Sequence, residues 1–329
     1  MNSSDDPDVR ATAARDWALQ QLGLADAAFA PASADASFRR YFRIEHGADS
    51  WVLMDAPPER EDCRPFLKVA QLLLDAGLNA PRVIAQDLTR GFLLLGDLGR
   101  RTYLHAIDDG NADALMRDAI DALIRWQLAS RPGVLPAYDA ALLQRELALF
   151  PDWYVGRHLE TALNDAQAER LAAIDARLIA SALAQPRVYV HRDYMPRNLM
   201  ISTPNPGILD FQDAVEGPIA YDVVSLFKDA FLSWPAERVE DWRRQYAERA
   251  RRAGLPVADD AEFARQFDWM GVQRHLKVIG IFARINYRDG KPHYLADVPR
   301  FIAYVREVAQ RYRELTPLLR LFDELGMAA

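Results

Sequence analysis

The segment from Val190 to Asp213 holds the residues of this chain that are best suited to chemistry, in the order VHRDYMPRNLMISTPNPGILDFQD. Asp193 could orient a substrate hydroxyl and accept its proton. Asn198 and Asp210 offer an amide and a carboxylate oxygen, which are the hard ligands that Mg²⁺ prefers. A base beside a magnesium site can move a phosphoryl group from ATP to a hydroxyl, because the metal neutralises the phosphates. We therefore predict Asp193 as the catalytic residue, Asn198 and Asp210 as metal ligands, and ATP with Mg²⁺ as cofactors.

The spacing of these residues matches the H-R-D-x-x-x-x-N pattern of a kinase catalytic loop, which is followed by a metal-binding aspartate. Short apolar runs around the motif predict strands, and the loop after the first of them would place Asp193 and Asn198 on one rim. We expect His191 to be a packed, hydrogen-bonded scaffold residue rather than a base. The expected strands are 187–190, 199–201 and 207–210.

Length and composition bound the other possibilities. The chain has 329 residues and a net charge of −7, and half of its residues are apolar. Such a chain can form one two-lobed unit or two domains, and its acidity argues against non-specific binding to nucleic acid. Its single cysteine, Cys63, excludes an internal disulfide and fits a reducing compartment. The chain begins with acidic and polar residues and has no apolar run near the ~18 residues of a membrane span, so we expect a cytoplasmic protein without membrane contact.

The order of the expected elements separates a β-rich N-lobe from a larger, mainly helical C-lobe, which is an α+β fold class. Gly77 is a natural stop for the second expected helix. The pattern becomes mostly helical after residue 100, so we place the boundary after Gly96 and ATP in the cleft between the lobes. The N-lobe is 1–96 and the C-lobe is 97–329. The expected N-lobe elements are a helix at 10–22, two strands within 38–55, a helix at 63–76, and strands at 82–86 and 92–95.

With these elements in place, the chain resembles the aminoglycoside phosphotransferase and choline kinase family over roughly residues 30 to 300. Within that family it looks most similar to the bacterial anomeric kinases of N-acetylmuramate and N-acetylglucosamine. The resemblance implies a protein-kinase-like two-lobed fold. It also implies ATP-dependent phosphorylation of the C1 hydroxyl of a free cell-wall sugar during peptidoglycan recycling. The stretches that carry the narrower resemblance are Ser33–Arg43, Met54–Glu59, Leu209–Ala214 and Asn286–Gly290.

The resemblance also implies which residues meet the nucleotide. A turn after the first strands would cover the phosphates, and a strand-like hinge would meet the adenine edge through its backbone. Asp222 would be structural and would hold the backbone of the catalytic loop. The predicted nucleotide-binding residues are Ser33, Ala34, Asp35, Ala36 and Ser37 in the turn, and Gly96, Asp97 and Leu98 in the hinge.

Three departures from the family pattern stand out. The phosphate-covering turn contains no glycine, so it needs a different shape. Met54 stands where a kinase carries its phosphate-pairing lysine, and Met195 stands where aminoglycoside-kinase-like loops usually carry histidine. One of three arginines on the preceding strand could supply the missing positive charge, although a solvated strand face also explains them. These arginines are Arg39, Arg40 and Arg43.

Substrate recognition is predicted from charge. Between residues 271 and 300, six basic residues face two acidic ones, a balance of +4 in a chain of −7. Lys277, Arg284 and Arg288 fall at helical spacing on one face, which suits an anionic group such as a lactyl carboxylate, although a solvated helix side also explains most of them. Asp213 could bind metal through water or hold the sugar, and Arg197 could steady phosphate or sugar. The predicted substrate-binding residues are Asp213, Arg197, Arg284 and Arg288.

Two other functions stay open from the sequence. An aminoglycoside- or choline-type small-molecule kinase would need an acidic pocket for its cationic substrate, which the basic segment disfavours. A nucleotide-binding pseudokinase that acts through partners would fit the missing strand lysine, but it would not need Asp193 beside two metal ligands. The order of preference between muramate and glucosamine derivatives is also open, as is the choice between a monomer and a weak dimer.

Overall fold

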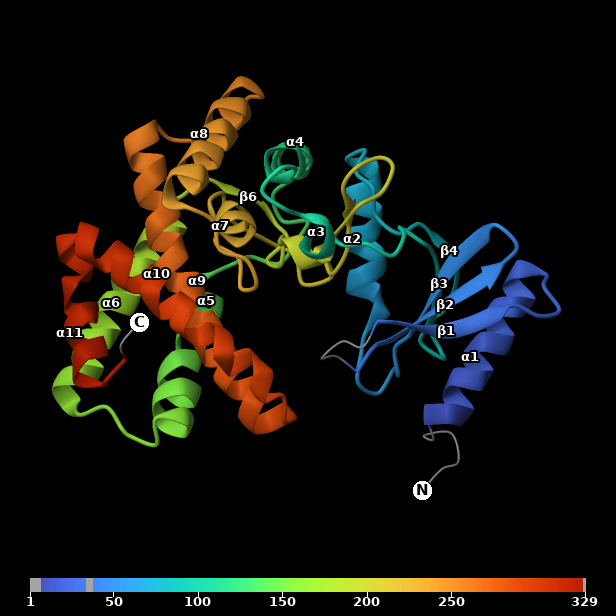
Figure 1. Ribbon diagram of the computed structural model, residues 1–329, viewed down its shortest axis with the longest axis horizontal. Coiled ribbons are helices and arrows are strands. Elements are labelled where there is room, and N and C mark those ends of the chain that lie inside the picture. Colours follow the sequence, from blue (N-terminus) through green and yellow to red (C-terminus); the bar gives the residue numbers. More distant parts are fainter. Residues whose placement is uncertain (1–6, 34–37, 328–329) are drawn as a thin grey trace. The chain divides into compact units, whose positions relative to one another are not determined.

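The computed structural model describes residues 7–33 and 38–327 and divides into two compact units (Figure 1). The first unit contains the chain up to Ala106 together with Asn198–Asp213, and the second contains Ile107–Arg197 and the residues from Ala214 onward. The β-rich first unit and the helical second unit confirm the predicted α+β class. The predicted catalytic segment is shared, because Asp193 belongs to the second unit, whereas Asn198 and Asp210 belong to the first.

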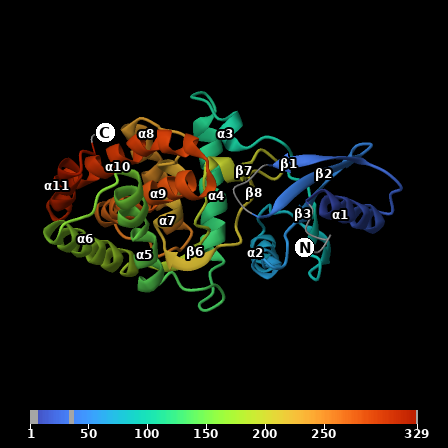
Figure 2. The ribbon, with the colours of Figure 1, turned by 90° about the horizontal axis from the view of Figure 1, so that it is seen from below.

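A five-stranded antiparallel sheet forms the core of the first unit, in the order β1-β2-β3-β5-β4. Helix α1 (Pro7–Leu22) lies along one face of it (Figure 2) and buries Trp17 against Ile44, Leu53 and Phe92. Strand β1 was not predicted, because a proline interrupts its short apolar run. The strands are β1 (Ala28–Ser33), β2 (Arg40–His46), β3 (Asp49–Asp55), β4 (Val83–Asp87) and β5 (Phe92–Gly96).

Helix α2 (Cys63–Asp75) confirms the helix predicted at 63–76. Asp62 caps its start by accepting a hydrogen bond from the N–H of Arg64, and Gly77 follows its end with a φ of +70°. The ring of Phe66 on this helix lies 4.8 Å from the ring of Phe211 in the segment that carries Asp210. The remaining elements of this unit are α3 (Tyr103–Ala106) and the paired strands β7 (Leu199–Met200) and β8 (Gly207–Ile208).

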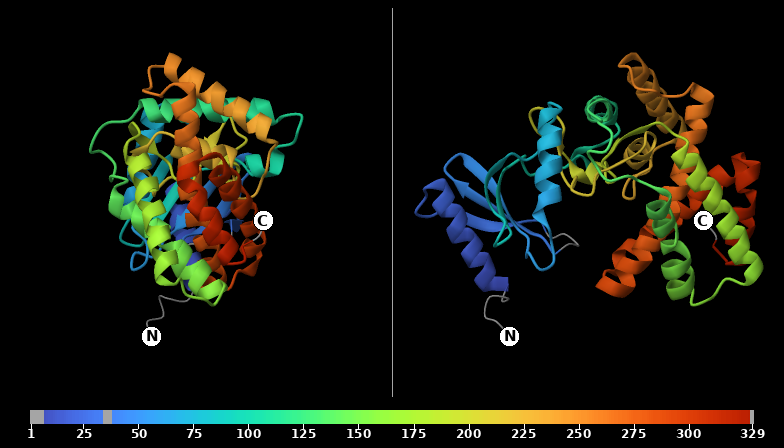
Figure 3. Two further views of the ribbon diagram at one scale, coloured as in Figure 1. Left: turned by 90° about the vertical axis from the view of Figure 1, so that its left-hand side faces the viewer. Right: turned by 180° about the vertical axis from the view of Figure 1, so that it is seen from behind.

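Helices build the second unit around α9 (Asp260–Asp289), a helix of 30 residues (Figure 3). Most of α9 from Phe263 to Ala283 is buried, so it is a core helix rather than an amphipathic surface helix. Strands β6 (Arg187–Val190) and β9 (Val215–Pro218) pair beside the catalytic segment, and β9 was not predicted. None of the helices in the two described ranges is long and apolar enough to cross a membrane.

The other elements of the second unit surround α9 and the β6–β9 pair. Helix η1 is a π-helix, a rare form that is frequently found at functional sites. The bounds are α4 (Ala112–Leu128), α5 (Ala140–Leu147), η1 (Phe150–His158), α6 (Asp165–Leu183), α7 (Tyr221–Phe227), α8 (Ala236–Arg252), η3 (Pro292–Asp297), α10 (Val298–Arg311), η4 (Arg313–Leu315) and α11 (Thr316–Glu324); the short turn η2 (Pro196–Asn198) leads into β7.

Candidate functional site

Asp222, in the first turn of α7, holds the backbone that precedes Asp193. Its carboxylate accepts the N–H of His191 at 2.6 Å and the N–H of Arg192 at 3.0 Å. The side chain is fully buried, and burial raises the pKa of Asp222 to about 7 although the two N–H groups favour the charged form. The expected structural role of Asp222 is therefore confirmed.

His191 packs beneath the same loop. It is 1% exposed, and its ring meets the ring of Tyr194 edge-on at 5.6 Å. Its Nδ1 accepts the backbone N–H of Asp193 at 3.3 Å, and the hydroxyl of Tyr194 donates to the carbonyl of Ala119 on α4 at 2.8 Å. The expected scaffold role of His191 is confirmed, and Asp193 itself is half-buried at the end of this hydrogen-bonded loop.

Left-handed backbone occurs at two positions of the predicted catalytic segment. Arg192 has a φ of +76° and Asp210 has a φ of +60°, and Glu160 is the third such non-glycine residue in the described ranges. This conformation costs about 1–2 kcal/mol for a residue with a side chain, so the surrounding contacts must compensate for it. Such residues concentrate at functional sites, which draws attention to what holds Arg192 and Asp210.

A buried carboxylate on α5 holds the Arg192 side chain. Glu146 Oε1 accepts Arg192 Nη2 at 2.5 Å and Lys277 Nζ at 3.0 Å, while Oε2 accepts the hydroxyl of Tyr138 and Gln273 Nε2, the latter at 3.3 Å. We call these five residues the Glu146 cluster. Four donors from three further parts of the chain thus converge on one carboxylate, which fixes the arginine next to Asp193. Sequence reasoning missed this cluster, because nothing in the spacing of its members links them.

The Glu146 cluster carries more positive than negative charge. Burial alone would raise the pKa of Glu146, but the charges of Lys277 and Arg192 and the Tyr138 hydroxyl hold it at about 2. Glu146 is therefore ionised, and it faces two cations. The pKa values of Arg192 and Lys277 are raised, with Asp193 among the negative charges that act on both. The cluster thus places a net positive field behind Asp193.

The two predicted metal ligands meet within the first unit. Asn198, which is 9% exposed, donates from Nδ2 to Asp210 Oδ2 at 3.4 Å, and Gln212 Nε2 donates to Asp210 Oδ1 at 2.9 Å. The carbonyl of Asn198 also accepts the N–H of Leu209 at 2.9 Å, so the β7–β8 pair sets the distance between the two side chains. Within the described ranges, no three histidine, cysteine, aspartate or glutamate side chains gather as a complete metal site.

Of the predicted nucleotide-binding residues, Ser33 ends β1, whereas Ala34–Ser37 lie outside the described residues. Gly96 ends β5 and donates its N–H to the carbonyl of Arg82 at 2.9 Å, and Leu98 lies against Gly207 of β8. Asp97 is engaged through its side chain, which accepts from Arg43 Nε at 2.6 Å and from the N–H of Gly99 at 2.9 Å. Burial would raise the pKa of Asp97, but the hydrogen bonds from Arg43 and Ser50 bring it below its usual value.

Arg39, Arg40 and Arg43 do not form a solvated strand face, so that interpretation was wrong. Met54 is completely buried. Arg40 pairs with Asp55, which also accepts Arg10 Nε at 2.7 Å. Arg43 pairs with Asp97, and Arg39 Nε lies 3.8 Å from Glu61 Oε2.

The prediction of a basic surface on α9 was also wrong in part. Arg274 is 2% exposed and Lys277 is 7% exposed, and Lys277 is committed to Glu146 and to the hydroxyl of Tyr221 at 2.8 Å. Helical spacing groups residues on one side of a helix but does not say which side is buried, and α9 is surrounded. The first and last turns of α9 reach the surface, and in the last turns Arg284 is half-buried and Arg288 is exposed.

The four predicted substrate-binding residues have different surroundings. Arg288 is paired with its neighbour Asp289 at 2.7 Å, and burial lowers the pKa of Arg284. The guanidinium of Arg197 lies 5.0 Å above the ring of Phe231, and Asp213 is exposed. Arg197 belongs to the second unit with Arg284 and Arg288, and Asp213 belongs to the first.

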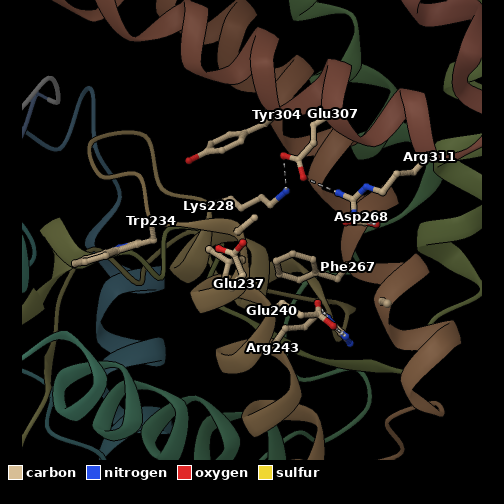
Figure 4. Close-up of a pocket in the computed structure, with 13 residues that line it drawn as sticks. Lys228, Trp234, Glu237, Glu240, Arg243, Phe267, Asp268, Tyr304, Glu307 and Arg311 are labelled. Atoms are coloured by element: carbon tan, nitrogen blue, oxygen red, sulfur yellow. Dashed lines mark hydrogen bonds and ion pairs between the residues drawn. The ribbon is translucent and has the colours of Figure 1, made fainter. Parts of the chain in front are cut away.

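A pocket in the second unit lies between the end of α7, α8, α9 and α10 (Figure 4), with a volume of about 350 Å³. Trp234, Phe267 and Tyr304 contribute aromatic rings to it. Most of its charged side chains pair with one another, as Arg243 does with Glu240 at 2.6 Å. No residue of the catalytic segment lines it. None of the residues predicted from the sequence as catalytic, metal-binding, nucleotide-binding or substrate-binding lines this pocket.

The chain is similar in sequence to a known protein family and to named relatives. Residues 28–261 match the phosphotransferase enzyme family. A protein of Pseudomonas putida, named N-acetylmuramate/N-acetylglucosamine kinase, is 59% identical over 299 residues, which cover 91% of this chain and 88% of the relative. A protein of the same name from Neisseria meningitidis is 50% identical over 300 residues, or 89% of each chain.

The fold is also similar to that of solved phosphotransferases. The ADP-bound crystal structure of the aminoglycoside phosphotransferase APH(2'')-Ib superimposes with a TM-score of 0.60 at 15% identity, over 88% of this chain and 96% of that one. This likeness confirms the predicted protein-kinase-like fold. Because the family match spans more than half of the chain and the relatives align along nearly all of it, this chain belongs to the phosphotransferase enzyme family.

Proposed function

We propose that this protein transfers the γ-phosphoryl group of ATP to the anomeric C1 hydroxyl of N-acetylmuramate, N-acetylglucosamine or both. The observation that carries the choice of substrate is the 59% identity to relatives named N-acetylmuramate/N-acetylglucosamine kinase, which extends over nearly the whole chain. The free sugars would come from the turnover of peptidoglycan, and we place the reaction in the cytoplasm, where ATP is available.

Asp193 is the proposed catalytic residue. It would accept a hydrogen bond from the C1 hydroxyl and take its proton as the bond to phosphorus forms. Two fixed supports favour this role, namely the N–H hydrogen bonds from the preceding backbone to Asp222 and the Glu146 cluster that holds the side chain of Arg192. A base held in this way loses little entropy on reaching the reactive geometry.

Asn198 and Asp210 are the proposed ligands of Mg²⁺. An amide oxygen and a carboxylate suit this hard cation, and the two side chains already meet at 3.4 Å. One carboxylate and one amide leave most ligand positions to water and to nucleotide phosphates, which is usual for magnesium in kinases. When bound, the metal would neutralise charge on the phosphates. Gln212 would keep Asp210 oriented through the hydrogen bond to its Oδ1.

The hinge at Gly96–Leu98 is proposed to meet the adenine edge through its backbone, as the resemblance to kinases implies. Two hydrogen bonds from Arg43 support this proposal, because they restrict the motion of the hinge. One goes to the side chain of Asp97, and the other goes to the carbonyl of Gly99 at 2.8 Å. The turn at Ser33–Ser37 is proposed to cover the phosphates.

Among the predicted substrate-binding residues, we propose that Arg284 binds the lactyl carboxylate. It is half-buried, whereas the charge of Arg288 is matched by Asp289. Partial burial strengthens a charge-assisted hydrogen bond, and the arginine fork fits two carboxylate oxygens. Arg197 and Asp213 remain proposed contacts for phosphate or sugar, with Arg197 steadied by the ring of Phe231.

The test is an ADP-release assay on N-acetylmuramate, N-acetylglucosamine, choline and an aminoglycoside, with the unaltered protein and Asp193→Asn. We expect turnover of at least one of the two sugars, a fall of at least ~100-fold in Asp193→Asn, and nearly unchanged ATP binding in that variant. Faster turnover of choline or the aminoglycoside would overturn the substrate class. Undiminished turnover in Asp193→Asn would overturn the role of Asp193.

A further inference from the structure

Lys228, which directly follows α7, lies among the side chains that line the pocket of the second unit (Figure 4). It is 7% exposed. Its Nζ lies 3.8 Å from Glu307 Oε2, which is an ion-pair distance but too long for a hydrogen bond. The rings of Tyr304 and Phe267 are centred 5.2 Å and 5.9 Å from the same nitrogen. No group in the described ranges accepts a hydrogen bond from this ammonium.

A second lysine of the same unit is equally exposed but has hydrogen-bond partners. Lys277 Nζ lies 3.0 Å from Glu146 Oε1 and donates to the hydroxyl of Tyr221 at 2.8 Å. Burial acts to lower the pKa of both lysines, but Tyr221 and Glu146 reverse this effect and raise the pKa of Lys277. The pKa of Lys228 stays lowered. Lys228 is therefore a buried cation whose N–H groups lack an acceptor.

The two arginines of the pocket are already paired with carboxylates. Arg243 donates to both oxygens of Glu240, at 2.9 Å and 2.6 Å. Arg311 lies 3.1 Å from Asp268 and 3.0 Å from Glu307. A ligand would gain little from either arginine, because the arginine would first have to leave a carboxylate without its partner.

One carboxylate of the pocket has no cation. Glu237, in the first turn of α8, is exposed, and its side chain makes no hydrogen bond or ion pair within residues 7–33 and 38–327. Among the described residues that line the pocket, four carboxylates face three cations. A simple anion would add to this negative excess, whereas a zwitterion would leave the balance unchanged. A zwitterion would also supply a partner to both Lys228 and Glu237.

Aromatic rings form a large part of the remaining lining. Trp234, Phe267 and Tyr304 contribute them, and the volume of about 350 Å³ lies at the lower end of the range for small-molecule sites. The rings can bury the apolar part of a ligand and keep water away from its contact with Lys228, which strengthens that contact. Trp234 adds a donor, because its Nε1 is buried and has no acceptor in the described part of the chain. This lining suits a small molecule with an apolar body.

Glu307 need not be displaced by the carboxylate of a ligand. Its side chain is 48% exposed, and Arg311 holds its Oε1 at 3.0 Å. When a ligand carboxylate approaches Lys228, Glu307 thus stays paired with Arg311 and in contact with water. No buried charge is left without a partner.

We propose that this pocket binds a small zwitterion with an apolar body, of which an aromatic amino acid is the simplest example. The carboxylate of the ligand binds the ammonium of Lys228, and its own ammonium faces Glu237. Its apolar body packs against the three aromatic rings. No residue proposed to act in phosphoryl transfer lines the pocket, so this inference does not depend on the proposed function.

Three ligands with the same phenyl ring test the assignment in ligand-observed NMR titrations of the full chain. L-Phenylalanine carries both charges, 3-phenylpropionate lacks the ammonium and phenethylamine lacks the carboxylate. Phenylalanine should bind about tenfold to a hundredfold more tightly than phenethylamine, as expected for a shielded charge-assisted contact with Lys228. It should bind up to about fivefold more tightly than 3-phenylpropionate, because Glu237 is exposed.

These titrations of the unaltered protein can already contradict the proposal. If phenylalanine shows no saturable binding at millimolar concentration, the pocket does not take this class of ligand. Equal binding of phenylalanine and phenethylamine would remove Lys228 from recognition. If 3-phenylpropionate binds as tightly as phenylalanine or more tightly, the ligand is a simple anion and the proposed zwitterion is wrong.

Two variants locate the site. Lys228→Met should weaken the binding of phenylalanine and 3-phenylpropionate about tenfold to a hundredfold and leave that of phenethylamine unchanged. Glu237→Gln should weaken phenylalanine and phenethylamine by up to about fivefold and leave 3-phenylpropionate unchanged. The matched control is Glu248→Gln, because Glu248 also lies on α8 but pairs with Arg252 and does not line the pocket.

Melting temperatures without ligand establish that the variants are folded. Lys228→Met should melt no lower than the unaltered protein, because it removes a buried cation that has no acceptor. Phenylalanine should then raise the melting temperature of the unaltered protein and of Glu248→Gln, but not that of Lys228→Met. If phenylalanine binds Lys228→Met as tightly as it binds the unaltered protein, the ligand lies elsewhere and the proposal fails.

Discussion

Replacing Glu146 by glutamine should destabilise the second unit strongly. The substitution keeps the size of the side chain and one oxygen acceptor but removes the charge that compensates Arg192 and Lys277, whose side chains are 19% and 9% exposed. Removing one partner of a buried ion pair costs about 3–5 kcal/mol, because a charge is left without compensation. The pKa of Glu146, about 2 against a usual 4.5, gives a similar magnitude of about 3 kcal/mol.

Urea unfolding at pH 7 measures this loss, and Glu324→Gln on α11 is the matched control. Glu324 binds Arg170 at the surface, so its loss should change the free energy of unfolding little. Adding Lys277→Met to Glu146→Gln should recover part of the stability, since only one uncompensated cation then remains. If Glu146→Gln unfolds at the same urea concentration as the control, the charge account of the Glu146 cluster is wrong.

The same cluster predicts a pH dependence. The pKa of Glu146 is lowered in the folded protein, so its contribution is present above the unfolded value of 4.5 and disappears as the pH falls toward about 2. Glu146→Gln should therefore flatten the loss of stability between pH 4.5 and 2. An unchanged acid-unfolding profile would contradict the depressed pKa.

Three further substitutions test other parts of the structure. Burial raises the pKa of Asp175 on α6 to about 6, so the free energy of unfolding falls as the pH rises from 3.8 through 6. In urea unfolding, Asp175→Asn should therefore raise the free energy of unfolding by about 1–3 kcal/mol at pH 8 and leave it unchanged at pH 3. A Cβ at Gly280 would overlap the backbone of Leu149, so Gly280→Ala should destabilise the protein by about 1–3 kcal/mol, measured as a lower melting temperature. A Cβ at Gly271 on the same helix meets nothing closer than 3.6 Å, so Gly271→Ala should be neutral or stabilising. Arg284→Ala should raise KM for N-acetylmuramate about tenfold to a hundredfold and leave KM for N-acetylglucosamine nearly unchanged; equal effects on both sugars would remove Arg284 from carboxylate recognition.

The sequence predicts the parts of this fold that depend on local patterns. Helix α2 could be placed because an apolar stripe ends at Gly77. Strands β2 and β3 could be placed because β-branched and aromatic residues cluster in them, and β5 because it is a short apolar run. Strand β1 escaped prediction because Pro31 removes a hydrogen-bond donor within a short run. The catalytic segment could be found because its chemistry fixes residue types at short spacing.

Contacts between distant residues could not be predicted in this way. Glu146 lies 46 residues before Arg192, and no sequence pattern predicts their ion pair. Lys277 was interpreted as part of a basic surface, since its spacing with Arg284 says nothing about which side of α9 faces the core. The ion pair of Arg40 with Asp55 depends on the register of β2 against β3, which the sequence leaves undetermined.

The central claim is that the anomeric hydroxyl of an N-acetylated amino sugar receives the phosphoryl group. Phosphorus NMR of a reaction with ATP and Mg²⁺ tests it most directly, with N-acetylmuramate and N-acetylglucosamine as free sugars and as their 1-O-methyl glycosides. We predict a sugar 1-phosphate signal, split by the anomeric proton, from at least one free sugar and no sugar phosphate from either glycoside. Phosphorylation of a glycoside, or a product that carries phosphate at another hydroxyl, would contradict the account.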